Sequence, residues 1–370
     1  MNFKKIRWLS ILIMSSFFLI SCSQEIETWR PISADKKIKI AILGDDEYIK
    51  DNGTMDAIEL ATSDFYHKTG FQIETEIYDD DADYNKGIAY AKQIAEDMDI
   101  AAVLVKQELD YIDATAEIFN DAQKPFIITN GCYESTIDKA YEYMIVDCIN
   151  ADIAGNIMGE YVINQGYQYV AFCHSDTKYE EDELKGFQAK IEGSSVTLAD
   201  TMVGPYTQEE FDIAYARWTT LGINAVCISN YDILNSDLVR MLREKNSDIK
   251  VIGDYVMDSD EDIAVNGEFL EGTAIIGMYL NDWQENDSTI MQKFQEKYGM
   301  EMSERAIQSY DIVYLLGEGV ISGITEPKEL LEYIKLCEYD SIAGVLKFDE
   351  NGCLIPNGNE MLLFRDGIFQ

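Results

Sequence analysis

The sequence predicts an α/β protein built from two parallel-sheet lobes, and three observations support this prediction. Short apolar segments, such as 38–43 and 100–105, alternate with amphipathic stretches of helical length. Such alternation is typical of βαβ units, in which helices cover both faces of a buried parallel sheet. The rhythm restarts after about residue 150, and a chain of 370 residues is long enough for two domains.

The predicted elements follow this rhythm along the chain. In the first half we expect strands at 38–43, 71–78, 100–105 and 125–129, and helices at 53–69, 84–97 and 109–121. Asp83 is a suitable N-cap for the second of these helices, in which Ile88, Ala91 and Ala95 recur at helical spacing. In the second half we expect helices at 151–165, 179–191, 207–220 and 232–245, and strands at 167–173, 195–203, 225–229 and 249–253. The region 283–336 is mainly helical, and short strands near 344–349 and 361–369 close the chain.

The amino-terminal region has the pattern of an export signal. Lys4, Lys5 and Arg7 precede an apolar run that is too short to span a bilayer. The run ends in Leu-Ile-Ser-Cys at 19–22, which resembles the lipobox of bacterial lipoproteins. The resemblance implies a signal peptide at 1–21, acylation (palmitate) of Cys22, and a tether at 22–36. Two acyl chains would hold the protein stably at a membrane. The alternative is an ordinary secreted protein whose cysteine is incidental.

Charge and composition exclude several other classes of function. The formal net charge of −39 argues against nucleic acid as a partner and against an electrostatic hold on anionic lipid. The six cysteines beyond Cys22 permit disulfides, but their wide and irregular spacing favours free, buried thiols.

Signals for catalysis and for metal binding are thin. The chain has two histidines, and no glycine-rich phosphate loop or nucleophile motif. The acidic run at 79–83 fails the calcium-loop pattern, because Tyr84 and Tyr90 stand at the positions that need Gly and Glu. We therefore expect no enzyme activity, no cofactor, no catalytic residue and no metal site.

From about residue 38 to the carboxyl terminus, the chain resembles the type I solute-binding proteins of ABC importers, in the Leu/Ile/Val-binding branch. The stretches that carry the likeness are IKIAILG with NGTMDAIELATSDF, YDDDADYNKGIAYAKQIAEDMDIAAVLV, SYDIVYLLGEGV at 309–320 and GVLKFDENG at 344–352. The resemblance implies two Rossmann-like lobes joined by a three-crossover hinge, with crossings near 147–150, 275–278 and 350–354. The expected lobes are 37–148 plus 277–352 and 149–276 plus 353–370. The resemblance also implies that the protein captures a small solute in the cleft between the lobes and delivers it to an ABC permease. The protein would lie at the cell envelope and face the periplasm or the exterior.

The family's ligand contacts carry over only in part. Lys106-Gln107-Glu108-Leu109-Asp110 stands where the family holds a small polar loop, and Cys132 takes the place of a threonine. Tyr179 and Tyr231 match aromatic positions, and Asp254 lies near the family's ammonium-binding acid. The residues expected to line the cleft are Tyr48, Asn130, Cys132, Tyr179, Tyr231 and Asp254.

The chemistry of these loops indicates a polar solute, such as an amino acid or an amide. Acids at 45–47, 108, 110 and 134 accompany the tyrosines, and carboxylates beside aromatic faces suit a cation or an uncharged polar molecule. The alternative is that these acids only face solvent. Leucine, isoleucine and valine are not expected ligands, because Glu108 would repel their carboxylate. Rival functions are a receptor that signals a ligand to a membrane partner, and an envelope lipoprotein with a degenerate cleft.

Overall fold

The computed structural model describes residues 29–369, except for 51–52, 205, 230–234, 259, 278–288, 343 and 357–360. The first sheet has five parallel strands in the order β2-β1-β3-β4-β5. Their bounds are β1 (Lys37–Gly44), β2 (Gln72–Asp79), β3 (Ile100–Lys106), β4 (Phe126–Ile128) and β5 (Met144–Val146). Every residue of β3 is buried, as expected for a central strand of a sheet covered on both faces.

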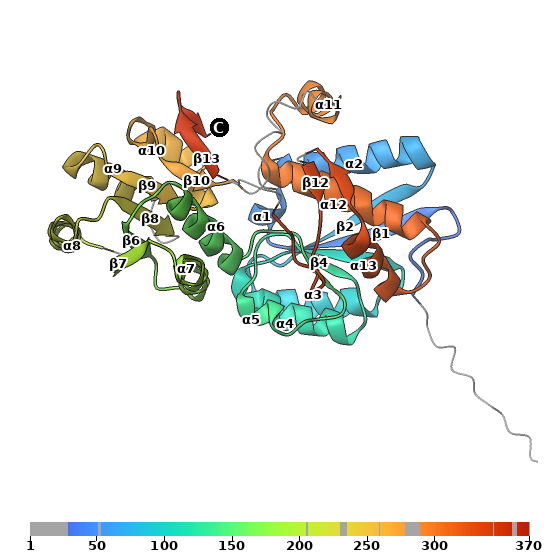
Figure 1. Ribbon diagram of the computed structural model, residues 1–370. Helices are drawn as coiled ribbons and strands as arrows, with labels where there is room; N and C mark the ends of the chain where they lie inside the picture. The colour runs from blue at the N-terminus through green and yellow to red at the C-terminus, as the bar shows by residue number, and fades with distance from the viewer. Residues whose placement is uncertain are drawn as a thin grey trace, which may run out of the picture.

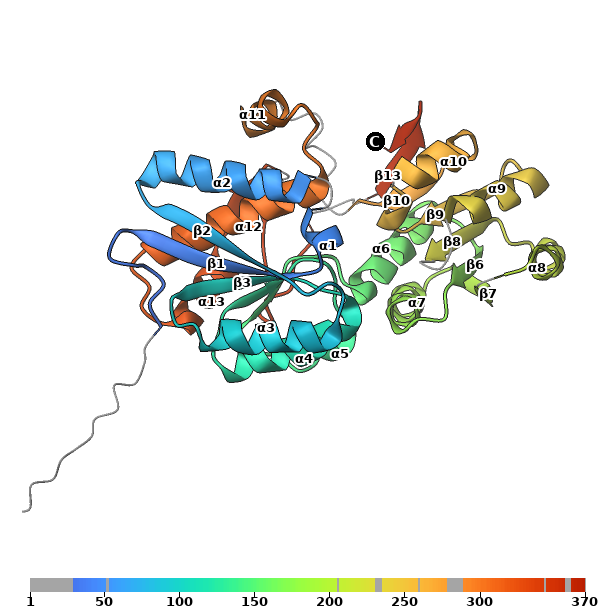
Figure 2. The same ribbon diagram turned by 180° about the vertical axis from the view of Figure 1, so that it is seen from behind.

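Helices cover both faces of this sheet (Figures 1 and 2). Those that follow its strands or return to it are α1 (Asp46–Lys50), α2 (Thr54–Thr69), α3 (Tyr84–Glu96), α4 (Leu109–Asp121), α5 (Glu134–Ile137), α11 (Thr289–Tyr298), α12 (Glu304–Ile321) and α13 (Pro327–Leu336). In both views α2 and α12 lie on one side of the sheet, and α3 and α4 lie on the other. A small hairpin of β11 (Tyr339–Ser341) and β12 (Gly344–Leu346) follows α13.

The second sheet has seven strands in the order β14-β13-β10-β9-β8-β6-β7. Their bounds are β6 (Tyr169–His174), β7 (Thr197–Val203), β8 (Ala225–Ser229), β9 (Lys250–Gly253), β10 (Ala274–Ile276), β13 (Met361–Arg365) and β14 (Ile368–Phe369). Strands β6 to β10 are parallel, whereas β13 and β14 add an antiparallel edge. The helices of this lobe are α6 (Ala151–Asn164), α7 (Lys178–Ile191), α8 (Gln208–Leu221), α9 (Asn235–Lys245) and α10 (Asp260–Leu270).

The alternation of side chains along β6 explains the two cores of this lobe. Val170 and Phe172 pack in the core that contains α6 and α7, whereas Ala171 and Cys173 pack in the core that contains α8 and α9. Successive residues of a strand point to opposite faces, so a strand buried on both faces is apolar throughout. Cys173 is fully buried, and the cysteines among the described residues are free, which confirms the prediction of free thiols.

Local sequence fixes the helix ends. The Asp83 side chain accepts a hydrogen bond from Lys86 N, which confirms the predicted cap of α3. Asn150 caps α6 in the same way, and Thr207 with Glu210 forms a capping box at α8. Helix α2 ends at Gly70, whose φ of 75° is the left-handed conformation that glycine adopts without steric cost.

The chain passes between the two sheets three times, which gives the hinge of the predicted fold. It leaves the first sheet after β5, returns after β10, and leaves again after Leu354. The first and third passes lie side by side, because Val146 N donates to Gly352 O and Leu354 N donates to Val146 O. The predicted α/β fold of two parallel-sheet lobes is therefore confirmed. Strands β5 and β10 and helix α10 were not predicted.

Close packing between α6 and α7 holds the second lobe's cleft-facing helix in place. A Cβ atom added at Gly155 would lie 1.9 Å from Glu183 O, and one at Gly186 would lie 2.3 Å from Asp152 O. Only glycine permits so close an approach of two helix backbones.

Among the described residues, no helix has the length and apolar character needed to cross a membrane.

Candidate functional site

A cavity of about 260 Å³ lies between the two lobes, at the carboxyl ends of their parallel strands. This is the edge at which open α/β sheets bind ligands. Its lining comes from the loops after β3 and β4, from α7, from the turn after β9 and from the first turn of α12. The lining residues are Gln107, Glu108, Leu109, Asp110, Asn130, Tyr133, Thr177, Tyr179, Tyr255 and Arg305.

A second cavity of about 430 Å³ lies at the opposite, amino-terminal end of the first sheet. Ion pairs such as Arg30–Asp99 and Lys37–Glu74 occupy its walls. The side chains of Arg30 and Asp99 are each about 60 % exposed, so this pair is screened by solvent. Because the interlobe cavity is at the ligand-binding edge and is lined by both lobes, we take it as the candidate site, here called the interlobe pocket.

The first-lobe wall contains a buried polar network centred on Gln107. Gln107 Nε2 donates to Asp80 Oδ2 at 2.7 Å, and Thr115 Oγ1 donates to Gln107 Oε1 at 2.8 Å. Asp80 Oδ1 accepts a further hydrogen bond from Ala82 N at 3.2 Å. Burial raises the pKa of Asp80, while these donors act in the opposite direction. The network fixes the orientation of the Gln107 amide before any solute arrives.

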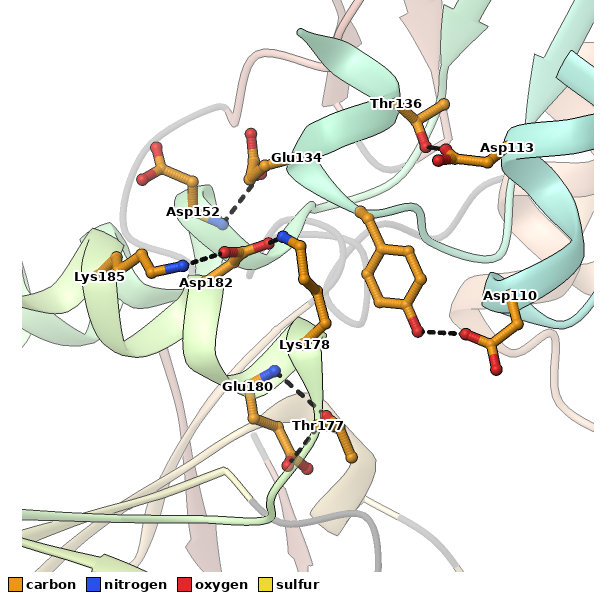
Figure 3. Close-up of polar contacts among 11 residues, drawn as sticks. Asp110, Asp113, Glu134, Thr136, Asp152, Thr177, Lys178, Glu180, Asp182 and Lys185 are labelled. Carbon is orange, nitrogen blue, oxygen red and sulfur yellow. Dashed lines mark hydrogen bonds and ion pairs between the residues drawn. The ribbon is translucent and has the colours of Figure 1, made fainter. Parts of the chain in front are cut away.

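Tyr133 is held at the mouth of the pocket by groups from both lobes. Its hydroxyl donates to Asp110 Oδ1 at 2.6 Å, and the Lys178 ammonium lies 5.8 Å from its ring centroid. In Figure 3 Asp110 comes from the first lobe and Lys178 from the second, and the Lys178 ammonium is directed at Asp182. Partial burial and the hydrogen bond to Asp110 both raise the pKa of the Tyr133 hydroxyl. The phenol is therefore neutral and presents its ring to the pocket.

Beside the pocket, carboxylates of both lobes meet in a seam (Figure 3). Glu134 Oε1 accepts a hydrogen bond from Asp152 N, in the first turn of α6, at 3.2 Å. Asp182 forms ion pairs with Lys178 and with Lys185. Burial raises the pKa of Glu134, and the neighbouring Asp152 and Asp182 add to this effect. The Glu134 contact connects the first lobe directly to a helix of the second.

The second lobe contributes tyrosines to the pocket lining and contains several fully buried carboxyl groups. Tyr179 is buried, and its hydroxyl lies 3.5 Å from Ile149 O. Glu180, Glu183 and Asp254 are each 0 % exposed, and none of the three lines the pocket. Ser229 Oγ donates to Glu183 Oε2, and Tyr255 N donates to Asp254 Oδ1 at 2.6 Å.

The surroundings raise the pKa of two of these carboxyl groups, Glu183 and Asp254. Burial raises the pKa of Asp254 to about 7, against the hydrogen bond from Tyr255 N and together with the charge of Glu180. Burial likewise raises the pKa of Glu183, and the neighbouring Asp254 adds to the effect. Glu183 Oε1 and Asp254 Oδ2 have no hydrogen-bond partner.

The residues predicted from sequence fall in different places. Asn130 and Tyr179 line the pocket, whereas Asp254 lies fully buried behind Tyr255. Cys132 is buried in the first-lobe core, because Gly131, with a φ of 110°, turns the chain there. Tyr231 lies outside the described residues, as does the side chain of Tyr48 on α1, and Cys22 also lies outside them.

Three lining residues were missed by the sequence analysis. Thr177 is the N-cap of α7, and Tyr255 begins a short 3₁₀ helix directly after Asp254. Arg305 comes from α12, which is distant in sequence from the other lining loops. The signal for Thr177 and Tyr255 was their position just after predicted strands, whereas no local signal identified Arg305. Among the described residues, no group of three or more His, Cys, Asp and Glu side chains is arranged to hold a metal ion.

Comparison with known proteins gives the same fold. A substrate-binding protein of an ABC transporter from Desulfitobacterium hafniense, in complex with Leu, superposes with a TM-score of 0.78 at 18% identity, over 90% of this chain and 99% of that one. A branched-chain amino acid transporter substrate-binding protein from Streptococcus pneumoniae, in complex with isoleucine, gives 0.72 at 15% identity, over 90% and 98%. A solute-binding protein from R. palustris, in complex with benzoate, gives 0.69 at 16% identity, over 90% and 94%.

A search of curated protein sequences found no match. The family model described as "Periplasmic binding protein" matches residues 37–354, which is most of the sequence. Together with the two sheets, the triple crossing and the interlobe pocket, this match confirms the resemblance found in the sequence. The chain belongs to the periplasmic binding protein family.

Proposed function

We propose that this protein is the solute receptor of an ABC importer and captures a small polar solute in the interlobe pocket. The observation that carries the proposal is the composition of the pocket wall. Side chains from both lobes, including Asn130 and Tyr133 from the first and Thr177, Tyr179 and Tyr255 from the second, surround one cavity. A solute bound there would bridge the lobes and favour their closed arrangement, because it contacts both. Such a receptor needs no catalytic group, and we propose none.

We further propose that the receptor is a lipoprotein, cut before Cys22 and acylated on it, that faces the periplasm or the exterior. Within the expected tether at 22–36, Arg30 N donates to Met98 O and Gln72 N donates to Lys36 O. The part of the tether after residue 29 therefore packs on the amino-terminal end of the first sheet. The intact mass of the mature protein tests the anchor. A chain that begins at Cys22 and carries two or three acyl groups supports it, whereas an unmodified chain cut elsewhere contradicts it.

We propose that the first lobe comprises residues 37–148 and 277–352, and that the second comprises residues 149–276 and 353–370. We also propose that the receptor delivers its solute to permease subunits in the membrane. Cys353 and Leu354, the first residues of the segment 353–370, pack in the core of the first lobe. We therefore include these two residues in the proposed hinge. Limited proteolysis with and without solute would locate the segments that become protected when the lobes close.

The decisive experiment for the receptor function is the identification of a bound solute. The protein is purified without denaturation, and mass spectrometry of the released small molecules is compared with that of a matched blank. Any solute found is added back after dialysis under mild denaturant, and the thermal midpoint of unfolding is measured. A rise that grows with solute concentration supports the proposal, since a ligand of the native state stabilises it by mass action. If no solute is released and a broad library of small metabolites leaves the midpoint unchanged, the receptor function is wrong.

A further inference from the structure

The charge of the interlobe pocket is unbalanced toward acid. Its lining contains two carboxylates, Glu108 and Asp110, and one guanidinium, that of Arg305. The remaining lining residues are uncharged. A charge-complementary solute therefore carries more positive than negative charge.

Two further acids lie fully buried in the second lobe, next to the elements that line the pocket. Glu183 and Asp254 are fully buried, and each has one carboxylate oxygen without a hydrogen-bond partner. The groups that act on Glu183 and Asp254 are carboxyls, the Ser229 hydroxyl and the Tyr255 N–H, so no cation among them offsets their charge. Buried charge of this kind is costly unless a proton or a nearby cation compensates it. A positive group bound near them would favour their charged form.

The helix amino termini around the cleft are already occupied by acids of the chain itself. Such termini attract anions through the helix dipole. Here Asp110 lies in the first turn of α4, and Glu180 and Glu181 lie in the first turn of α7. At α6 the Glu134 carboxylate accepts the Asp152 N–H. The acids at the amino termini of α4, α6 and α7 would therefore repel an anionic solute, whereas a helix terminus without an acid would attract one.

Three tyrosine rings complete the environment. Tyr133, Tyr179 and Tyr255 come from the loop after β4, from α7 and from the turn after β9, and all three line the pocket. The Tyr133 hydroxyl is engaged by Asp110, and the Lys178 ammonium lies 5.8 Å from the centroid of its ring. Aromatic faces beside carboxylates attract ammonium groups by cation–π interaction as well as by charge.

We propose that the solute of the interlobe pocket is a small organic cation with a net positive charge. Its ammonium groups lie against Glu108, Asp110 and the tyrosine rings, and a carboxylate, where the solute has one, lies at Arg305. The inference rests on the proposed receptor function. The shared chemistry is an alkylammonium group, and its two sources are a basic amino acid and a diamine.

A ligand panel tests the proposal and separates these sources. Isothermal titration calorimetry and thermal unfolding are measured with lysine, norleucine, 1,5-diaminopentane, leucine and benzoate. Norleucine is the matched control, because it has the same carbon chain as lysine without the ε-ammonium. We expect lysine or 1,5-diaminopentane to bind at least about tenfold more tightly than norleucine, with an affinity that falls as salt is raised. Tighter binding of lysine indicates a carboxylate contact at Arg305, and tighter binding of the diamine indicates none.

Two variants locate the effect. Glu108→Gln keeps the size of the side chain and removes its charge, and we expect it to weaken cation binding by about tenfold or more. Glu117→Gln, at an exposed position of α4, the helix that begins directly after Glu108, should leave the affinity unchanged. Unfolding of both ligand-free proteins is compared with that of the wild type, and Asp110→Asn, at an exposed residue, provides a second variant if Glu108→Gln does not fold.

The outcomes distinguish this inference from the receptor function on which it rests. Binding of leucine, norleucine or benzoate as tightly as of both cations overturns the cation proposal and leaves the receptor function standing. Failure of both cations to bind overturns it as well. Failure of every compound, with no solute released from the purified protein, overturns the receptor function too.

Discussion

The two walls of the pocket differ in how their buried acids are satisfied. In the first lobe, both oxygens of Asp80 accept hydrogen bonds, one from Gln107 Nε2 and one from Ala82 N. In the second lobe, Asp254 accepts one from Tyr255 N, and its other oxygen has no partner. A satisfied network fixes its side chains in advance, whereas an incomplete one responds to protons and to nearby charge. The first-lobe acid is therefore fixed by its donors, whereas the charge state of the second-lobe acid depends on its surroundings.

The largest expected effect comes from removing the charge of Asp254. Its pKa is raised to about 7 by burial, whereas in the unfolded chain it has the ordinary value near 3.8. Between these two values the folded protein holds a proton that the unfolded chain has lost, so stability falls as pH rises from about 4 to about 7. The full difference is on the order of 4 kcal/mol. Asp254→Asn should reduce this fall and raise stability at pH 8, as measured by urea unfolding across this pH range.

The neighbouring acids Glu180 and Glu183, both on α7, interact electrostatically with Asp254. Asp176→Asn, at an exposed site after β6, is the control and should follow the wild-type pH profile. A profile that is the same for Asp254→Asn and for the wild type would show that Asp254 is not the group that titrates.

A second, somewhat smaller effect is expected at the contact that holds α7 in the wall. In Gly155→Ala the new methyl group would meet the Glu183 carbonyl at 1.9 Å, so α6 and α7 must separate. We expect a loss of about 3 kcal/mol in unfolding free energy, the upper part of the range for overpacking. Because α7 contributes Thr177 and Tyr179 to the pocket, solute affinity should fall as well.

Gly267→Ala is the matched control for this substitution. A Cβ atom at Gly267, in α10, meets nothing nearer than 3.6 Å. The free energy of unfolding of Gly267→Ala should therefore equal that of the wild type or be slightly higher. Equal stabilities of the two alanine variants in chemical denaturation would rule out a tight α6–α7 contact.

The smallest expected effect tests the first lobe. Gln107→Leu removes the donor to Asp80 Oδ2 and the acceptor for Thr115 Oγ1. Loss of these buried hydrogen bonds should cost about 1–3 kcal/mol. Gln188→Leu, at an exposed position of α7, should cost less than about 0.5 kcal/mol. If Gln107→Leu unfolds at the same denaturant concentration as Gln188→Leu, the first-lobe network is not the rigid element described above.

The sequence predicted the fold well where its signals are local. Apolar strands such as β3 and the Asp83 cap of α3 can be recognised within a few neighbouring residues. Strands β5 and β10 have three residues each, too few to show a period, so they were missed.

The pocket was harder to predict, because its lining depends on chain direction and on distant segments. Cys132 follows β4 as Asn130 does, but the turn at Gly131 sends its side chain into the core. Arg305 reaches the pocket from a helix that is far along the chain. Asp254 was placed at the right strand end, although its burial behind Tyr255 follows only from three-dimensional packing.

The position of β1 has a mechanical consequence. Strand β1 lies between β2 and β3 and runs parallel to both, and the chain enters the first lobe through it. Tension applied at the amino-terminal end along this strand would act in shear on the hydrogen bonds to both neighbours at once. Tension applied at β14, which is an edge strand paired only with β13, would open one pair after another. A molecule tethered by its amino terminus would therefore carry load through a strand that is paired on both sides, and not through an edge strand.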